Sequence, residues 1–163
     1  MIHVLEKKVT DKIAAGEVID RPVSIIKELL ENSIDAGADN ITVEIKNGGK
    51  SYIRVTDNGC GISPEDIETA FKRHATSKIS SVKDLDSIIT LGFRGEALAS
   101  ICAVSRVELI SKTSENKIGR RIVTEGSEII VNEGCGCPDG TTVSVRDLFY
   151  NVPARKKFLS SDN

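Results

Sequence analysis

The spacing of hydrophobic residues predicts a long amphipathic helix near the start of the chain. Between residues 23 and 36, apolar side chains recur at the spacing of one helix face, at Val23, Ile26, Leu30 and Ile34. Pro22 suits the first turn, where its missing N–H costs no hydrogen bond, and Gly37 suits the end. A separate polar stripe contains Glu28, Asn32 and Asp35, because residues three or four apart share a face.

Alternation of apolar and polar residues predicts strands. Residues 41–46 and 52–56 alternate on either side of a hairpin-type turn, Asn47-Gly48-Gly49-Lys50. Later strand-like runs, separated by turns, occupy residues 107–110, 121–123, 128–131 and 142–145. Together with the helices, they predict an α+β fold, a two-layer sandwich of helices on a mostly antiparallel, mixed sheet.

Shorter helices are predicted between these elements. Thr10-Asp11 is expected to cap one that ends at Gly16, and Ser63 to cap another with Pro64 in its first turn. Two more are expected over residues 96–104 and 151–159. Residues 74–95 have little periodicity, so we expect a mobile loop there.

Composition narrows the class of protein. The 163 residues suffice for one domain, and 39% hydrophobic and 28% charged residues are normal for a soluble globular protein. No apolar run approaches the roughly 20 residues that span a bilayer, and the first residues lack a signal-peptide layout. We therefore expect a cytoplasmic protein. A net charge of −2 predicts no strong general attraction to nucleic acid.

Two local features leave alternatives open. The basic cluster Arg155-Lys156-Lys157 could contact DNA, although a solvated helix end is the more typical explanation. The four cysteines are Cys60, Cys102, Cys135 and Cys137. Zinc sites usually need a second cysteine pair, which the chain lacks, so free reduced thiols are favoured over a metal site or a disulfide.

Glu28 and Asn32 have the chemistry of a hydrolytic site. A carboxylate that faces a pocket from a helix can orient or deprotonate a water molecule. An asparagine oxygen suits a hard cation such as Mg²⁺. The ordinary alternatives are a solvated glutamate and an exposed or locally bonded asparagine.

A second candidate follows the strand at residues 52–56, in the segment Asp57-Asn58-Gly59-Cys60-Gly61-Ile62. Gly59 and Gly61 permit unusual dihedral angles and leave room for a flat ligand near the backbone. An ionised Asp57 only accepts hydrogen bonds, so it can receive one from an exocyclic amine such as that of adenine. The alternative is an Asx-type turn after a strand.

A third candidate is Gly92-Phe93-Arg94-Gly95-Glu96, which opens a helix whose N–H groups favour phosphate. It lacks the Gly-Lys-Ser/Thr ending of a Walker loop, so a P-loop is a poor match. His74-Ala75-Thr76-Ser77-Lys78 adds hydroxyls and a cation. Either segment alone would be typical of a solvated connection.

In this order, residues 27–38, 57–62 and 92–98 resemble the ATPase superfamily of gyrase, heat-shock chaperones, histidine kinases and MutL. Residues 14–19, 73–78 and 147–155 look like the MutL family of DNA mismatch-repair proteins within it. The resemblance covers essentially the whole chain and implies the Bergerat-type ATP-binding fold.

By this resemblance, Glu28 is the general base and Asn32 binds Mg²⁺ beside the nucleotide. Asp57 receives the adenine amino group within the Gly59 and Gly61 segment, helped by a water molecule and Thr141. The lid over the phosphates is formed by Thr76, Ser77, Lys78, Gly92, Phe93, Arg94, Gly95, Glu96, Ala97 and Leu98.

The resemblance also implies cofactors and partners. ATP and Mg²⁺ would be bound, and ATP would drive two such domains to associate as a homodimer. The mismatch-recognition protein MutS would be a partner, DNA would be contacted weakly through this chain, and no membrane would be involved. The function implied is coupling of mismatch recognition to strand removal, in the bacterial cytoplasm near the nucleoid.

The family continues with a second domain that supplies a phosphate-contacting lysine, and with a carboxyl-terminal dimerisation domain. We therefore expect residues 1–163 to be an ATP-binding domain fragment that hydrolyses ATP weakly or not at all. The alternatives are an ATPase module of a related topoisomerase or chaperone and an interaction domain that binds no nucleotide.

Overall fold

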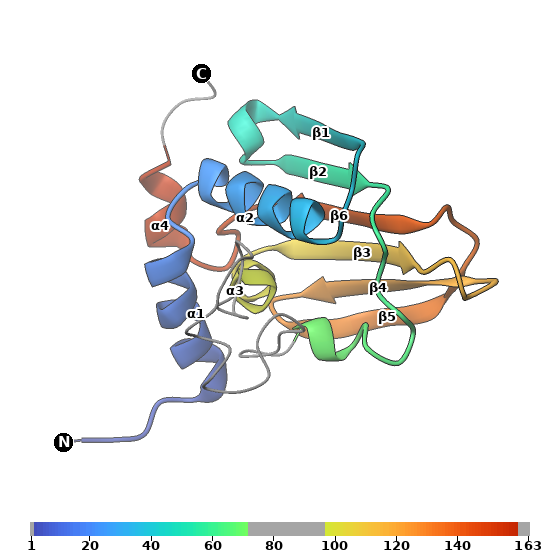
Figure 1. The fold of residues 1–163 in the computed structure, drawn as a ribbon. Helices are drawn as coiled ribbons and strands as arrows, with labels where there is room; N and C mark the ends of the chain where they lie inside the picture. The colour runs from blue at the N-terminus through green and yellow to red at the C-terminus, as the bar shows by residue number, and fades with distance from the viewer. Residues whose placement is uncertain (1, 72–96, 160–163) are drawn as a thin grey trace, which may run out of the picture.

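A computed structural model describes residues 2–71 and 97–159, with only the backbone described for residues 16–18. The chain forms a six-stranded sheet with helices packed on one face (Figure 1). The helices are α1 (Lys7–Val18), α2 (Pro22–Asp35), α3 (Ala97–Ala103) and α4 (Pro153–Lys157). The strands are β1 (Ile41–Lys46), β2 (Tyr52–Asp57), β3 (Arg106–Lys112), β4 (Gly119–Glu125), β5 (Glu128–Cys135) and β6 (Gly140–Arg146).

The strand order of the sheet is β1-β2-β6-β3-β4-β5. The predicted two-layer α+β architecture is confirmed, and among the described residues every strand pairing is antiparallel. Strand β6, which comes last in the chain, lies in the middle between β2 and β3. This insertion brings the start of β6, at Gly140 and Thr141, beside Asp57 and the segment that follows β2.

The core is built from rows of cross-strand neighbours on the helix-covered face. One row joins Ile53, Val145 and Val107, and the next joins Val55, Val143 and Leu109. All six side chains are buried. The opposite face is polar, and there Arg121 forms ion pairs of 2.9 Å with Glu108 and Glu133. The alternation along the strands therefore separates a dry face from a wet one.

Helix α2 buries a different face from the predicted stripe. Its buried residues are Ile25, Leu29 and Ser33, whereas Val23 is 56% exposed and Ile34 is 55% exposed. The predicted stripe is therefore wrong at its two ends, whereas Ile26 within it is partly buried and packs against the core. The cause is the serine: a polar residue at the third position of the buried ridge hides that ridge from a search for apolar periodicity.

Helix α1 is longer than predicted. It begins at Lys7 and continues through Gly16 to Val18, so neither the cap at Thr10 nor the end at Gly16 was correct. The Thr10 hydroxyl instead donates to the carbonyl oxygen of Lys7 at 2.9 Å. Ala15 is fully buried and α1 packs against α3, and this packing outweighs the roughly 1 kcal/mol that a glycine costs inside a helix.

The helix predicted at Ser63 is also wrong. The chain forms turns there, followed by a short 3-10 helix at Thr69–Phe71. The Ser63 hydroxyl bonds to the Asp66 carboxylate at 3.1 Å, while Ile67 anchors the segment in the core. The loop predicted over residues 74–95 lies outside the described residues. In the parts that are described, no helix is long and apolar enough to cross a membrane.

Candidate functional site

The candidate site lies where the rows of the core end in a polar row. Beyond the row of Val55, Val143 and Leu109, the same register places Asp57 beside Thr141, and Thr141 beside Ser111. These three residues share the helix-covered face, because cross-strand neighbours point to the same side of a sheet. The sheet therefore presents two hydroxyls and a carboxylate to the helix layer where these three strands reach Asp57, Thr141 and Ser111.

Three donors hold the carboxylate of Asp57 in place. Its Oδ1 atom accepts the N–H groups of Gly59 at 2.9 Å and Thr141 at 3.2 Å. Its Oδ2 atom accepts the hydroxyl of Ser33 from α2 at 2.7 Å. Each carboxylate oxygen has about two acceptor positions, so Oδ1 is filled and Oδ2 retains one. Within the described residues, Asp57 is thus a fixed acceptor with one acceptor position that no hydrogen bond occupies.

A hydroxyl cluster continues the row. The Ser111 Oγ atom lies 2.7 Å from Thr141 Oγ1, 3.0 Å from the Gly140 carbonyl oxygen and 2.8 Å from the Ile62 backbone nitrogen. Ser111 is only 1% exposed, so its hydroxyl depends on these partners. The cluster ties the segment after β2 to both β3 and β6.

The two glycines after Asp57 allow close packing within the protein. Gly61 has φ +73°, and a Cβ placed on it would lie 2.0 Å from the carbonyl oxygen of Lys112. A Cβ on Gly59 would lie 2.8 Å from both Cβ and the carbonyl oxygen of Ala36. The backbone of β3 therefore packs closely against Gly61, and the end of α2 packs closely against Gly59. The sequence interpretation expected these glycines to leave room for a ligand and did not predict that they allow close packing within the protein.

Glu28 and Asn32 are both partly buried and lie one turn apart on the flank of α2 beside its buried ridge. The bond from Ser33 to Asp57 brings the Asn32 end of α2 to the polar row, with Glu28 one turn further away. No group of three or more His, Cys, Asp or Glu side chains that could hold a metal occurs within residues 2–71 and 97–159. A Mg²⁺ ion here would therefore rely on the Asn32 oxygen, on water and on phosphate, which suits a cation that keeps several waters.

The remaining predicted residues divide into two groups. Ala97 and Leu98 form the first turn of α3, where both are partly buried. The others lie outside the described residues, namely Thr76, Ser77, Lys78, Gly92, Phe93, Arg94, Gly95 and Glu96.

Sequence reasoning missed Ser33 and Ser111. Each carried a signal: Ser33 follows Ile25 and Leu29 at intervals of four, and Ser111 continues the alternation of Val107 and Leu109. The register of the sheet was needed to place these two serines beside Asp57 and Thr141.

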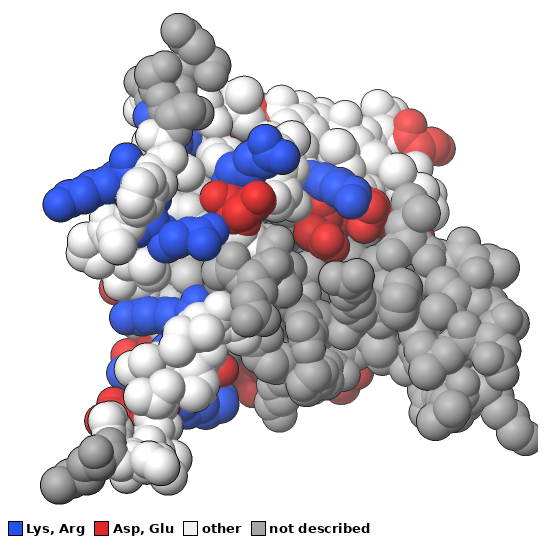
Figure 2. All heavy atoms as spheres, turned by 90° about the vertical axis from the view of Figure 1, so that its left-hand side faces the viewer, with Lys and Arg blue, Asp and Glu red and all other residues white. Residues whose placement is uncertain are grey.

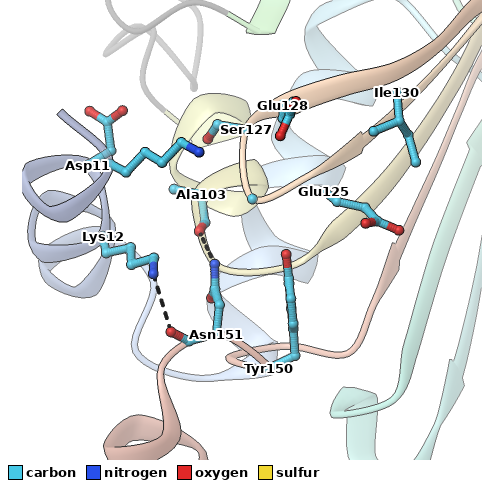
Figure 3. A pocket seen from close by; sticks show the side chains of 11 residues that line it. Asp11, Lys12, Ala103, Glu125, Ser127, Glu128, Ile130, Tyr150 and Asn151 are labelled. Atoms are coloured by element: carbon cyan, nitrogen blue, oxygen red, sulfur yellow. Dashed lines mark hydrogen bonds between the residues drawn. The ribbon is translucent and has the colours of Figure 1, made fainter. Parts of the chain in front are cut away.

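A separate pocket of about 300 Å³ lies at the other end of the sheet. Figure 3 shows the side chain of Lys12 reaching the Asn151 carbonyl oxygen, and the Asn151 amide reaching the Ala103 carbonyl oxygen. The lining carries both signs of charge, including Lys8, Asp11 and Glu128. None of the predicted site residues lines it, so it is distinct from the site around Asp57.

The basic cluster at the end of the chain is partly occupied by structural contacts. Arg155 donates to the carbonyl oxygen of Ile19 at 3.1 Å and lies over the ring of Phe149 at 5.1 Å. The neighbouring Lys156 and Lys157 are exposed. Figure 2, which views the side of α1 and α4, shows Lys and Arg interspersed with Asp and Glu. This mixed surface favours a solvated helix end over a dedicated DNA contact.

Residues 21–129 match the family described as histidine kinase-, DNA gyrase B-, and HSP90-like ATPase. The chain is 61% identical over 160 residues to a DNA mismatch repair protein MutL of Agathobacter rectalis, covering 98% of this chain and 25% of that protein. It is 60% identical to a MutL of Caldanaerobacter subterraneus, covering 97% of this chain and 27% of the relative. The chain thus spans about a quarter of the length of the curated relatives it matches.

Solved structures agree with this similarity. The Aquifex aeolicus MutL ATPase domain complexed with ADP is 41% identical, with a TM-score of 0.71, covering 89% of this chain and 50% of that one. The N-terminal domain of a DNA repair protein is 36% identical, with a TM-score of 0.76, covering 94% of this chain and 45% of that one.

Proposed function

Since the chain belongs to the histidine kinase-, DNA gyrase B- and HSP90-like ATPase family, as an ATPase domain of the MutL type, we propose that it binds ATP with the adenine on Asp57. The observation that carries this proposal is the carboxylate fixed by Ser33, Gly59 and Thr141 with one acceptor position left. An exocyclic amine supplies a hydrogen that such an acceptor can receive.

The arrangement of α2 supports roles for two further residues. With the adenine on Asp57, the phosphates would extend along α2 toward Asn32 and Glu28. Asn32 would hold Mg²⁺ against the phosphates, where the cation supplies charge neutralisation. Glu28 would orient the attacking water and take its proton, a role typically worth about 10²–10⁴-fold in rate.

In the longer protein, this ATPase would act as a switch. We propose that ATP binding promotes association of two such domains and that this change couples mismatch recognition by MutS to strand removal, with only weak DNA contact through residues 1–163. The support is the similarity to MutL proteins over 98% of the chain. The phosphate-contacting lysine and the dimerisation domain would lie in other segments, and the protein would act in the cytoplasm near the nucleoid.

Calorimetric titration with ATP and Mg²⁺ tests the adenine role of Asp57. Asp57→Ala removes a hydrogen bond to a charged acceptor, so ATP affinity should fall about ten- to a hundredfold. Asp39→Ala is the matched control, because its carboxylate bonds the neighbouring Asn58 side chain at 2.6 Å and is exposed. Equal affinity of a folded Asp57→Ala chain and the parental chain would rule out this role.

A further inference from the structure

We infer that Ser111 is a positioning residue for base specificity, which acts by turning the hydroxyl of Thr141 into a hydrogen-bond acceptor toward the nucleotide. The inference rests on the proposed binding of adenine at Asp57. Ser111 itself is buried and bonds to Thr141, which is the residue between it and Asp57 in the polar row.

The direction of the bonds follows from the number of hydrogens available. A serine hydroxyl has one hydrogen to donate and two lone pairs to accept with. The Ile62 N–H occupies one lone pair of Ser111, and the Gly140 carbonyl oxygen can only accept, so it takes the hydrogen. All three contacts of Ser111 are then hydrogen bonds only if Thr141 donates its own hydrogen to the second lone pair.

The consequence for a ligand is an edge made of acceptors. The single hydroxyl hydrogen of Thr141 points inward to Ser111, so Thr141 presents lone pairs on its other side. Its neighbour Asp57, whose Oδ1 atom accepts the Thr141 N–H at 3.2 Å, also presents an acceptor only. A base with an amino group at this edge finds partners for its hydrogens, directly or through a water molecule. A base with a carbonyl oxygen at this edge places an acceptor against the acceptors of Asp57 and Thr141, and their partial negative charges repel.

Burial explains why the cluster keeps this direction. Ser111 and Ser33 are 1% and 2% exposed, so water cannot readily replace a lost partner of either hydroxyl. An unpaired buried donor or acceptor costs more than the bond it loses, which penalises any rotation of Thr141 away from Ser111. On the same face of the sheet, the preceding positions of β3 and β6 are apolar, namely Leu109 and Val143.

The test compares ATP with inosine triphosphate, which carries a carbonyl oxygen in place of the adenine amine. Binding of each to the 163-residue chain is measured by calorimetry with Mg²⁺. The parental chain should prefer ATP. Ser111→Ala releases the Thr141 hydrogen to donate to the carbonyl oxygen, so the ratio of ATP to inosine triphosphate affinity should fall about tenfold, the value of one hydrogen bond. A purely structural role would weaken both ligands and leave the ratio unchanged.

Two further variants make the outcome decisive. Ser144→Ala is the matched control. Ser144 is also buried, but it lies on the opposite face of β6, between Arg54 and Glu108. The ratio of ATP to inosine triphosphate affinity in this variant should stay at the parental value. Thr141→Val keeps the bonds of Ser111 to Ile62 and Gly140 and should also lower the ratio. If Ser111→Ala does not fold, an unchanged ratio in Thr141→Val overturns the inference.

The failures of the two proposals differ. A parental chain that binds no nucleotide overturns the proposed function and this inference together. A parental chain that prefers ATP, with the same preference in folded Ser111→Ala and in Thr141→Val, overturns the role of Ser111 alone.

Discussion

At the scale of single residues, the candidate site consists of polar side chains at positions where their element otherwise buries apolar ones. Ser33 follows Ile25 and Leu29 in the ridge of α2, and Ser111 follows Leu109 in β3. Burying a hydroxyl is unfavourable unless it is hydrogen-bonded. Ser33 meets this condition through Asp57 itself, and Ser111 meets it through Thr141, the Gly140 carbonyl oxygen and the Ile62 N–H. The burial of both serines is therefore linked to the geometry around the Asp57 carboxylate.

Glu28 and Asn32 should separate chemistry from metal binding. We expect Glu28→Ala to retain ATP and Mg²⁺ affinity but to lose about 10²-fold or more in turnover, because the general base is removed. Asn32→Ala should instead weaken the Mg²⁺-dependent part of ATP affinity, because an oxygen ligand is lost. Turnover is measured in single-turnover assays on the protein extended to the length of the solved ATPase domains.

Glu31, which lies between these two residues on α2, provides the control. Glu31→Ala should change neither turnover nor the Mg²⁺ dependence. Turnover of Glu28→Ala at the parental rate would show that another group activates the water.

At the scale of elements, α2 has two sets of apolar side chains, of which one is buried and the other is exposed. Ile25 and Leu29 pack into the core, while Val23 and Ile34 remain on the surface. The same asymmetry occurs in the edge strand β1. Its Val43 and Ile45 lie beside the buried Val55 and Ile53, yet both are exposed. Which face of α2 is buried decides where Glu28 and Asn32 lie, since they flank that ridge.

Two isoleucines of α2 test this orientation. Ile25→Ala should lower the free energy of unfolding by about 2–4 kcal/mol, because it opens a cavity beside β2. Ile34→Ala removes the same atoms from a side chain that is 55% exposed and should cost less than about 1 kcal/mol. Urea unfolding followed by circular dichroism measures both values. Equal losses, or a larger loss for Ile34, would contradict the buried ridge that the structure shows.

At the scale of the whole molecule, helix α3 is almost entirely buried in the middle of the helix layer. Five consecutive residues of α3, from Ala99 to Ala103, are buried, and the helix lies against α1, α2 and the sheet. Cys102 is among them, and burial raises the pKa of its thiol from an ordinary value of 9.0 to about 12. Its protonation is therefore coupled to global unfolding.

The stability of the chain should fall in alkaline solution because of Cys102. Below pH 9 this thiol is protonated in both states and contributes no pH dependence. Between its unfolded pKa of 9.0 and its folded pKa of about 12, the unfolded chain releases a proton that the folded chain keeps, so rising pH favours unfolding. The slope from this group is about 1.4 kcal/mol per pH unit.

Comparison of the parental chain with Cys102→Ala isolates this slope from other titrating groups. Urea unfolding under reducing conditions should show the parental chain losing stability relative to the variant above pH 9, and no change in the difference below it. Cys60→Ala, at an exposed thiol, is the control and should follow the parental curve. A difference that stays constant across this pH range would contradict the burial of Cys102.

The sequence by itself determined the class of fold and the positions of the strands, and it predicted a set of candidate site residues. The alternation at residues 41–46, 52–56 and 107–110 is a local property with period two, so it predicts strands without knowledge of their partners. The residues expected to carry ATPase chemistry were predicted in the same way, because Asp57 with its glycines is a local motif. The family that they indicated agrees with the comparisons.

Only the tertiary structure decided which faces are buried and which polar residues meet. The length of α1 depends on packing against α3, and the buried ridge of α2 depends on Ser33 finding Asp57 across 24 positions of sequence. The insertion of β6 between β2 and β3 places Thr141 between Asp57 and Ser111, which are distant in sequence. Hydrogen bonds of this kind depend on the pairing order of strands. No local pattern contains that order, because any antiparallel strand can in principle pair with any other.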